Sequence, residues 1–178
     1  MKKIIALGAS SSKNSINKTL AIHAASKISN ATVAAIDLND YVLPLYSVDA
    51  ENEFGIPEEA HQVDEKIACA DGLVISLAEH NGSYTSVFKN LLDWLSRIDI
   101  KVWKDLPMLL MATSPGGQGG ASVLATAKNG FPYMGGNVVA DFSLPSFYDH
   151  FSNTSITNKE LATTLDEKVA LFEKSLTQ

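Results

Sequence analysis

Three short segments of the chain combine serine, asparagine and glycine residues in a pattern that suits ligand binding. They cover residues 8–17, 78–83 and 113–120. In the first segment, the candidate hydrogen-bond donors are the hydroxyl and amide side chains of Ser10, Ser11, Ser12, Ser15 and Asn17. Hydroxyls and amides donate hydrogen bonds to anions, and glycines let a ligand approach the backbone closely. These residue types suit a phosphate and a flat heterocycle better than hydrolytic chemistry.

The first segment runs into a predicted helix that starts near Ser15. The N-terminus of a helix exposes unpaired N–H groups and a partial positive charge, so it attracts phosphate. Lys13 could add a full charge. A simple helix cap is the alternative interpretation, but one capping residue would suffice for it. Neither Gly-x-x-x-x-Gly-Lys-Ser/Thr nor Gly-x-Gly-x-x-Gly occurs in this segment. The sequence therefore argues against P-loop nucleotide hydrolysis and against the dinucleotide fingerprint.

The three segments follow apolar runs that predict buried strands. The predicted strands cover residues 4–7, 32–36, 73–77, 108–112 and 137–142, and the predicted helices cover residues 15–29, 60–70, 87–95, 122–128 and 161–176. Continuous apolar strands that alternate with helices predict a doubly wound α/β sheet buried on both faces. Ligands of such sheets bind where loops leave the carboxyl ends of the strands. We expect residues 1–178 to form one domain.

Composition excludes several classes of function. The net charge is −6 and no basic cluster occurs, which argues against nucleic-acid binding. The lone Cys69 cannot form an internal disulfide, and it is expected to pack as a small apolar side chain. No histidine has metal-ligand spacing to another or to Cys69, so we predict no metal site. Because no apolar run suits a membrane span or a signal sequence, a cytoplasmic location is expected.

Several motifs match one enzyme family. They are Ser10-x-Ser12-x-x-Ser15-x-Asn17, Glu79-His80-Asn81-Gly82-Ser83, Lys89-Asn90-x-x-Asp93-Trp94-Leu95-Ser96-Arg97 and Ser114-Pro115-Gly116-Gly117-x-Gly119-Gly120. This set resembles the NAD(P)H-dependent FMN reductases, which include quinone, azo-dye and chromate reductases. The resemblance implies a flavodoxin-like sheet with five parallel strands in the order 2-1-3-4-5 and helices on both faces. It also implies FMN and NAD(P)H as cofactors.

The resemblance assigns a role to each segment. Ser10, Ser12, Ser15, Ile16 and Asn17 would bind the FMN phosphate. Residues Glu79, His80, Asn81, Gly82 and Ser83 would flank the isoalloxazine ring and ribityl chain, largely through their backbone. Residues Ser114, Pro115, Gly116 and Gly117 would contact the polar edge of the ring. The flavin carries the chemistry, passing hydride from nicotinamide through its N5 to a quinone, flavin or azo acceptor in a ping-pong scheme. No catalytic side chain is expected, although His80 is a candidate for a minor proton donor.

Two positions depart from the usual family pattern. Ser12 stands where the family usually has arginine, and Ala78-Glu79-His80-Asn81 stands where it usually has Pro-Glu-Tyr-Asn. The imidazole of His80 keeps a flat ring beside the flavin and introduces a side-chain type that titrates near neutral pH. Two interpretations of Glu79 stay open, a solvated loop acid and an orienting group for the loop. Gly82 is expected to be a turn glycine with positive φ as well as a ligand contact.

The resemblance also implies how copies of the chain assemble. The family implies a homodimer or homotetramer, in which residues 43–54 either cover a neighbour's flavin or form an exposed loop. Trp94 would be edge-of-core packing or a subunit contact, and the resemblance favours the contact.

A flavodoxin-like electron carrier without NAD(P)H turnover is the main alternative function, and a nucleotide-binding domain without chemistry is another. A serine hydrolase is discounted because Gly-x-Ser-x-Gly does not occur.

Overall fold

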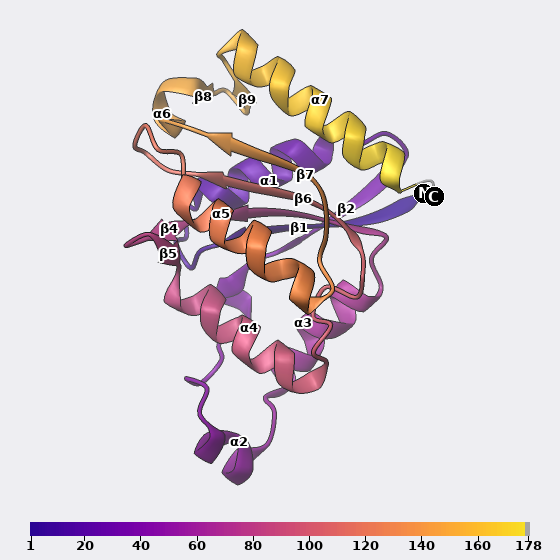
Figure 1. The fold of residues 1–178 in the computed structure, drawn as a ribbon, viewed down its shortest axis with the longest axis vertical. Helices are drawn as coiled ribbons and strands as arrows, with labels where there is room; N and C mark the ends of the chain where they lie inside the picture. The colour runs from indigo at the N-terminus through magenta and orange to yellow at the C-terminus, as the bar shows by residue number, and fades with distance from the viewer. Residues whose placement is uncertain (177–178) are drawn as a thin grey trace.

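A computed structural model describes residues 1–176 of the chain (Figure 1). Within these residues the main sheet has five parallel strands in the spatial order β2-β1-β3-β6-β7. The strands are β1 (Lys2–Ala9), β2 (Ala31–Ile36), β3 (Gly72–Leu77), β6 (Pro107–Thr113) and β7 (Asn137–Leu144). This order is the predicted 2-1-3-4-5, because β4 and β5 belong to a separate hairpin. The flavodoxin-like fold class is therefore confirmed.

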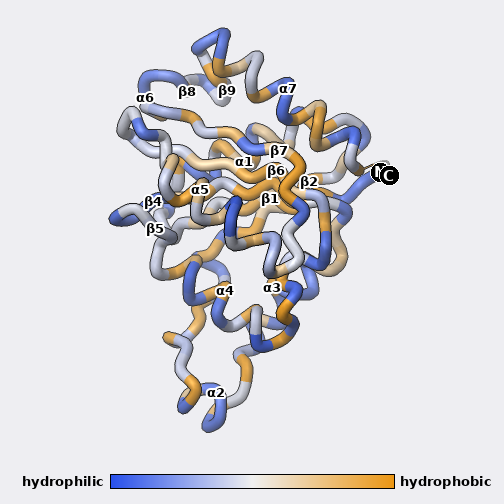
Figure 2. Tube along the Cα trace, in the orientation of Figure 1, coloured by the Kyte–Doolittle hydropathy of each residue, from blue (hydrophilic) through white to orange (hydrophobic). Residues whose placement is uncertain are grey.

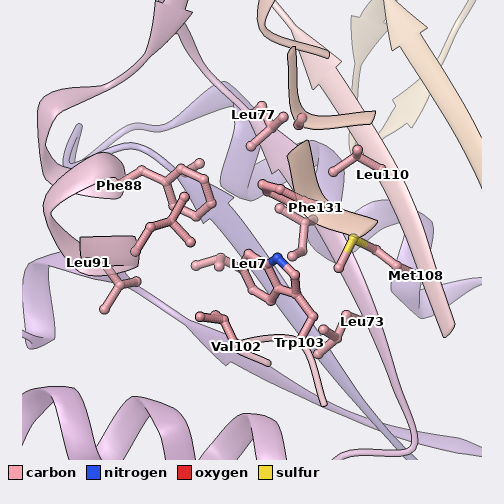
Figure 3. Close-up of a cluster of buried hydrophobic side chains, with 14 of the residues drawn as sticks. Leu7, Leu73, Leu77, Phe88, Leu91, Val102, Trp103, Met108, Leu110 and Phe131 are labelled. Atoms are coloured by element: carbon pink, nitrogen blue, oxygen red, sulfur yellow. The ribbon is translucent and has the colours of Figure 1, made fainter. Parts of the chain in front are cut away.

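Helices cover both faces of the sheet, as predicted. The longer ones are α1 (Ile16–Ser26), α3 (Glu58–Ala68), α4 (Ser86–Ile98), α5 (Ala121–Gly130) and α7 (Lys159–Ser175). The alternation of side chains along β1 divides the core, since Ile4 and Ala6 face α1 and α7 whereas Ile5 and Leu7 face α3, α4 and α5. Figure 3 shows the second of these layers, where Trp103 and Phe131 pack with ring centroids 4.7 Å apart.

Short elements fill segments for which the sequence predicted no structure. They are η1 (Leu38–Asp40), α2 (Val48–Phe54), β4 (Glu79–His80), β5 (Ser83–Tyr84), η2 (Phe131–Met134), α6 (Phe147–His150), β8 (Phe151–Ser152) and β9 (Ser155–Ile156). The α2 segment buries none of its residues and projects away from the rest of the molecule (Figures 1 and 2). The predicted helix over 15–29 ends earlier than expected, at Ser26.

Side-chain caps explain why the site helices begin where they do. Ser15 caps α1 by accepting a hydrogen bond from the N–H of Lys18, and Thr85 caps α4 by accepting from Phe88. The start of α1 also lies directly against β1, because a Cβ built on Gly8 would come within 2.3 Å of the Lys18 backbone nitrogen. The glycine therefore permits the close approach that holds the N-terminus of α1 at the carboxyl edge of the sheet.

Candidate functional site

One cleft at the carboxyl edge of the sheet brings the three predicted segments together. We call them loop 1 (residues 8–17), loop 2 (78–83) and loop 3 (113–120). The predicted residues that line the cleft are Ser10, Ser12, Ser15, Ile16, Asn17, Glu79, His80, Ser114 and Pro115. Asn14, Ala78, Thr113 and Tyr148 also line it and were not predicted. Asn81, Gly82, Ser83, Gly116 and Gly117 belong to the same loops but do not line this cleft.

The Asn17 side chain ties loop 1 to two strands from inside the protein. It is 2% exposed, and its amide oxygen accepts hydrogen bonds from the Ser76 hydroxyl (2.7 Å) and the Thr113 N–H (3.1 Å). Its amide nitrogen donates to the Thr113 carbonyl (3.1 Å). This buried side chain has a structural role that the sequence analysis did not foresee. The N–H of Asn17 still belongs to the first turn of α1, where backbone donors have no partner within the helix.

Loop 1 keeps hydrogen-bond donors for an anion. Ser10 shapes the loop, because its Oγ accepts from the Ser12 N–H (3.1 Å). The Oγ of Ser15 accepts from the Lys18 N–H, and its hydroxyl donates no hydrogen bond within residues 1–176. Ser15 is therefore a helix cap that can also donate into the cleft. With the first N–H groups of α1, these hydroxyls form a donor set that fits a phosphate.

The basic side chains near loop 1 are Lys13 and Lys18. Lys18 lies in the first turn of α1, but its ammonium group pairs with Asp37 after β2. The hydrogen bond from Lys18 holds the pKa of the Asp37 carboxyl below its usual value. Lys13 is exposed on loop 1, and Ser12 supplies a hydroxyl in place of the usual family arginine. The loop therefore offers a phosphate many neutral donors and little full charge.

Loop 2 is a tight β-hairpin. The strands β4 and β5 pair antiparallel, with Glu79 opposite Tyr84 and His80 opposite Ser83. The two turn residues, Asn81 and Gly82, have positive φ angles of 53° and 75°. An Asn-Gly pair is favoured in two-residue hairpin turns because both positions need positive φ. The predicted turn role of Gly82 is thus confirmed, and the hairpin carries His80 to the cleft.

Glu79 links loop 2 to the helix that follows loop 3. Its Oε2 accepts a hydrogen bond from the N–H of Val123 in the first turn of α5 (2.9 Å). The residue that precedes this helix, Gly120, offers no side-chain cap. Glu79 therefore caps α5 from another part of the chain, where a negative charge also interacts favourably with the helix dipole. Of the two open interpretations, the structure favours the orienting group.

The glycines of loop 3 divide into two kinds. Gly119 and Gly120 have positive φ, and a Cβ at Gly119 would lie 2.4 Å from the Ser143 Oγ. They are required by the fold. A Cβ at Gly117 would meet nothing within 4 Å, and at Gly116 only the Ser114 hydroxyl at 3.9 Å. Loop 3 therefore leaves its first two glycines open to a ligand.

Hydrogen bonds orient the peptide between those two open glycines. The Gly116 carbonyl accepts from the N–H groups of Gly119 (3.2 Å) and Ser146 (3.0 Å), and from the Ser114 hydroxyl (3.1 Å). In a trans peptide the N–H points opposite to the carbonyl. The N–H of Gly117 is therefore directed away from the groups that hold the carbonyl, as a donor to a ligand would need to be.

Several expectations outside the cleft require correction. Trp94 is 1% exposed within its own chain, where its Nε1 donates to the Pro44 carbonyl (2.8 Å) and its ring meets Tyr46 edge-on. The favoured subunit contact is therefore wrong. Cys69 is exposed rather than packed, because it follows the last residue of α3.

Within residues 1–176, no cluster of three or more potential metal ligands occurs, and no helix is long and apolar enough to span a bilayer.

Comparison with known proteins decides the family. The model of the NADPH-dependent FMN reductase family matches residues 2–149. The chain belongs to this family. The match confirms the predicted family and its cofactors, FMN and NAD(P)H. The motif residues that carried the resemblance lie within the matched range.

Proteins similar to this member of the FMN reductase family are named as quinone reductases or as NAD(P)H oxidoreductases. A 2-hydroxy-1,4-benzoquinone reductase from Burkholderia sp is 38% identical over 120 residues, which cover 67% of this chain and 64% of that protein. A quinone reductase from Escherichia coli K12 is 39% identical over 79 residues, which cover 44% and 42% of the two chains. These alignments span less than two thirds of either relative. The solved structure of FerB, a flavoenzyme NAD(P)H:(acceptor) oxidoreductase from Paracoccus denitrificans, is 25% identical, with a TM-score of 0.77 over 99% of this chain and 98% of that one.

Replacement of Asn17 by alanine is expected to destabilise the fold. The change leaves the Ser76 hydroxyl and both backbone groups of Thr113 without their buried partner, which costs about 1–3 kcal/mol per unsatisfied group. The free energy of unfolding, measured by urea denaturation, should fall by at least about 2 kcal/mol. The matched control is Asn14→Ala, since Asn14 is an exposed asparagine of the same loop. Equal stability of the two variants would contradict the structural role of Asn17.

Proposed function

We propose that this protein is an NAD(P)H-dependent flavoenzyme that binds FMN in the cleft and reduces small acceptors such as quinones, flavins or azo compounds. One observation carries the proposal: loops 1, 2 and 3 of the family pattern meet in a single cleft, where the Ser15 hydroxyl and the first N–H groups of α1 are left to donate to a ligand. The names of the quinone reductase relatives support the acceptor class. When bound, FMN would accept hydride from reduced nicotinamide and pass the electrons to the acceptor in a ping-pong sequence.

The residues would divide the work by loop. Ser10, Ser12 and Ser15 hold the phosphate with the backbone of Ile16 and Asn17. Loop 2, from Glu79 to Ser83, flanks the ribityl chain and the ring, and His80 places its imidazole there. Loop 3, from Ser114 to Gly117, presents backbone to the polar edge of the ring. The outward N–H of Gly117 would stabilise negative charge that develops at this edge.

The first test is spectroscopic. We expect the purified protein to show flavin absorption bands, as isolated or after addition of FMN. The bands should bleach when NADH or NADPH is added without oxygen, and a quinone should restore them. Bound flavin that neither nicotinamide bleaches would instead favour an electron carrier. Absence of flavin binding, even with FMN added, would contradict the proposal.

Replacement of Ser12 by arginine should strengthen FMN binding. The family arginine would add a charge-assisted contact to the phosphate, worth about 1.5–3 kcal/mol, so the Kd should fall about tenfold or more at low salt. The gain should shrink as ionic strength rises. Fluorescence titration of the apoprotein measures the Kd.

The matched control for that variant is Ser11→Arg. Ser11 is also exposed on loop 1, but it lines a neighbouring cavity with Leu38 and Leu91 instead of the cleft. The Ser11→Arg variant therefore adds the same positive charge to loop 1 without a direct contact to the phosphate. Riboflavin lacks the phosphate, so its affinity should not change in either variant. An equal gain for both arginines would show only long-range attraction and contradict the phosphate assignment.

We further propose that two copies of the chain associate through the α2 arm (residues 42–55). The arm exposes large apolar side chains, including Leu45 (83% exposed) and Phe54 (78%). The arm is attached to α4, because Arg97 Nε donates to the Glu51 carboxylate (3.0 Å) and Trp94 Nε1 donates to the Pro44 carbonyl (2.8 Å). A well-held segment with uncovered apolar side chains is typical of a protein interface. The partner would cover the apolar side chains of the arm.

The arm predicts a simple dissociation experiment. The Phe54→Asp variant should weaken self-association at least tenfold in sedimentation velocity runs over a range of concentrations, because a charge replaces an apolar contact. Its neighbour Glu53 is also exposed, so Glu53→Gln serves as the control and should behave like the wild type. A wild-type protein that stays monomeric at every concentration would refute the arm-mediated dimer.

A further inference from the structure

Tyr148 is a cleft residue that none of the predicted motifs contains. It lies on the short helix α6, just after β7, and its side chain is 69% exposed. It lines the same cleft as Ser15 of loop 1 and Pro115 of loop 3. A large exposed ring at the mouth of a ligand cleft is a candidate binding surface, because it offers apolar area at a small conformational cost.

The backbone that carries Tyr148 is attached to loop 3. The N–H of Ser146 donates to the Gly116 carbonyl (3.0 Å), and the N–H of Phe147 donates to the Ser114 carbonyl (3.0 Å). Phe147 is buried, and its ring stacks on Phe151 with centroids 4.8 Å apart. Two hydrogen bonds and a buried neighbour therefore hold the position of Tyr148 relative to the cleft. The ring itself meets Phe147 edge-on at 5.6 Å.

To bind a flat heterocycle, the cleft requires apolar contact surface in addition to the hydrogen-bond donors that it already has. Loop 1 already supplies several hydroxyl and backbone donors. A flat heterocycle, by contrast, is bound largely through apolar contact with its faces and edges. Rings reach the cleft from two separate elements, His80 on the loop 2 hairpin and Tyr148 on α6.

We propose that Tyr148 is a flavin-binding residue whose ring packs against the isoalloxazine from the β7 side of the cleft. The contact is made by the ring and not by the phenolic hydroxyl. The inference rests on the proposed function, since it requires FMN to occupy this cleft. It adds a fourth segment, the loop after β7, to the three loops that the motifs identify.

The test measures flavin binding to the apoprotein by fluorescence titration. Tyr148→Ala should raise the Kd for FMN about tenfold. Tyr148→Phe keeps the ring and should stay within about twofold of the wild type. The matched control is Tyr133→Ala, because Tyr133 is 87% exposed on η2 and does not line the cleft. Bound flavin should also fluoresce more strongly in Tyr148→Ala, since a neighbouring phenol ring quenches flavin emission.

Riboflavin separates a ring contact from a phosphate contact. The Tyr148→Ala change should weaken riboflavin and FMN binding by the same factor, because the two share the isoalloxazine. A loss confined to FMN, or a Tyr148→Phe variant as weak as Tyr148→Ala, would assign the contact to the hydroxyl and overturn the proposal. Unchanged affinity in Tyr148→Ala would overturn it as well. Thermal unfolding of each variant shows whether any loss reflects misfolding.

The same titration distinguishes the two proposals. If the wild type binds FMN and is reduced by nicotinamide while Tyr148→Ala binds equally well, only the role of Tyr148 fails. If the wild type binds no FMN, the proposed function fails and the role of Tyr148 fails with it. If the wild type binds FMN and the Tyr148→Ala variant binds it more weakly, the result supports both the proposed function and the role of Tyr148.

Discussion

The buried side chain of Asn17 is the contact on which the geometry of the cleft depends. A carboxamide has one oxygen that accepts and one nitrogen that donates, and Asn17 uses both at the ends of β3 and β6. Because the side chain is almost fully buried, any displacement of α1 would leave polar groups unpaired in a region of low dielectric constant. The position of loop 1 is therefore coupled to the ends of two strands that are distant in the sequence.

Other polar contacts extend this coupling across the carboxyl edge. The Thr85 hydroxyl, at the start of α4, donates to the Ala9 carbonyl at the end of β1 (2.9 Å). The Thr113 hydroxyl donates to the Leu144 carbonyl at the end of β7 (2.7 Å). Glu79 joins loop 2 to α5, and the Gly116 carbonyl joins loop 3 to α6. Each segment around the cleft is thus hydrogen-bonded to another, which preorganises the cleft for a rigid ligand.

The same contacts divide the polar groups of the loops into two sets. One set is hydrogen-bonded within the protein and includes the side-chain amide of Asn17, Oε2 of Glu79 and the Gly116 carbonyl. The other set, which includes the Ser15 hydroxyl proton and the first N–H groups of α1, is left for a ligand. A protein that binds a flavin through neutral donors needs this division, because a donor that is already hydrogen-bonded within the protein is not available to a phosphate. Tyr148 and His80 add ring surface to the second set.

Much of this architecture could be predicted because its causes are local. Apolar runs predicted all five strands of the sheet, and the rule that loops gather at the carboxyl ends of parallel strands predicted that loops 1, 2 and 3 meet. The Asn-Gly turn of loop 2 is likewise a property of two adjacent residues. The loop after β7 lies at the same edge, so that rule also applied to Tyr148, although no motif drew attention to it.

Tertiary structure alone decided how individual side chains are used. Asn17 and Thr113 are 96 residues apart in the chain, and Glu79 and Val123 are 44 apart. Residue type identified Asn17 as a donor and Glu79 as an acid, but not the partner that each would find. Trp94 and Cys69 show the same limit, since burial depends on which segment folds over a helix: Pro44 covers Trp94, whereas Cys69 stays exposed. The sequence by itself determined the sheet, its loops and the family. The fold determined which polar groups are bonded internally and which are left facing the cleft, because the energy of a polar group depends on neighbours that only the folded chain brings together.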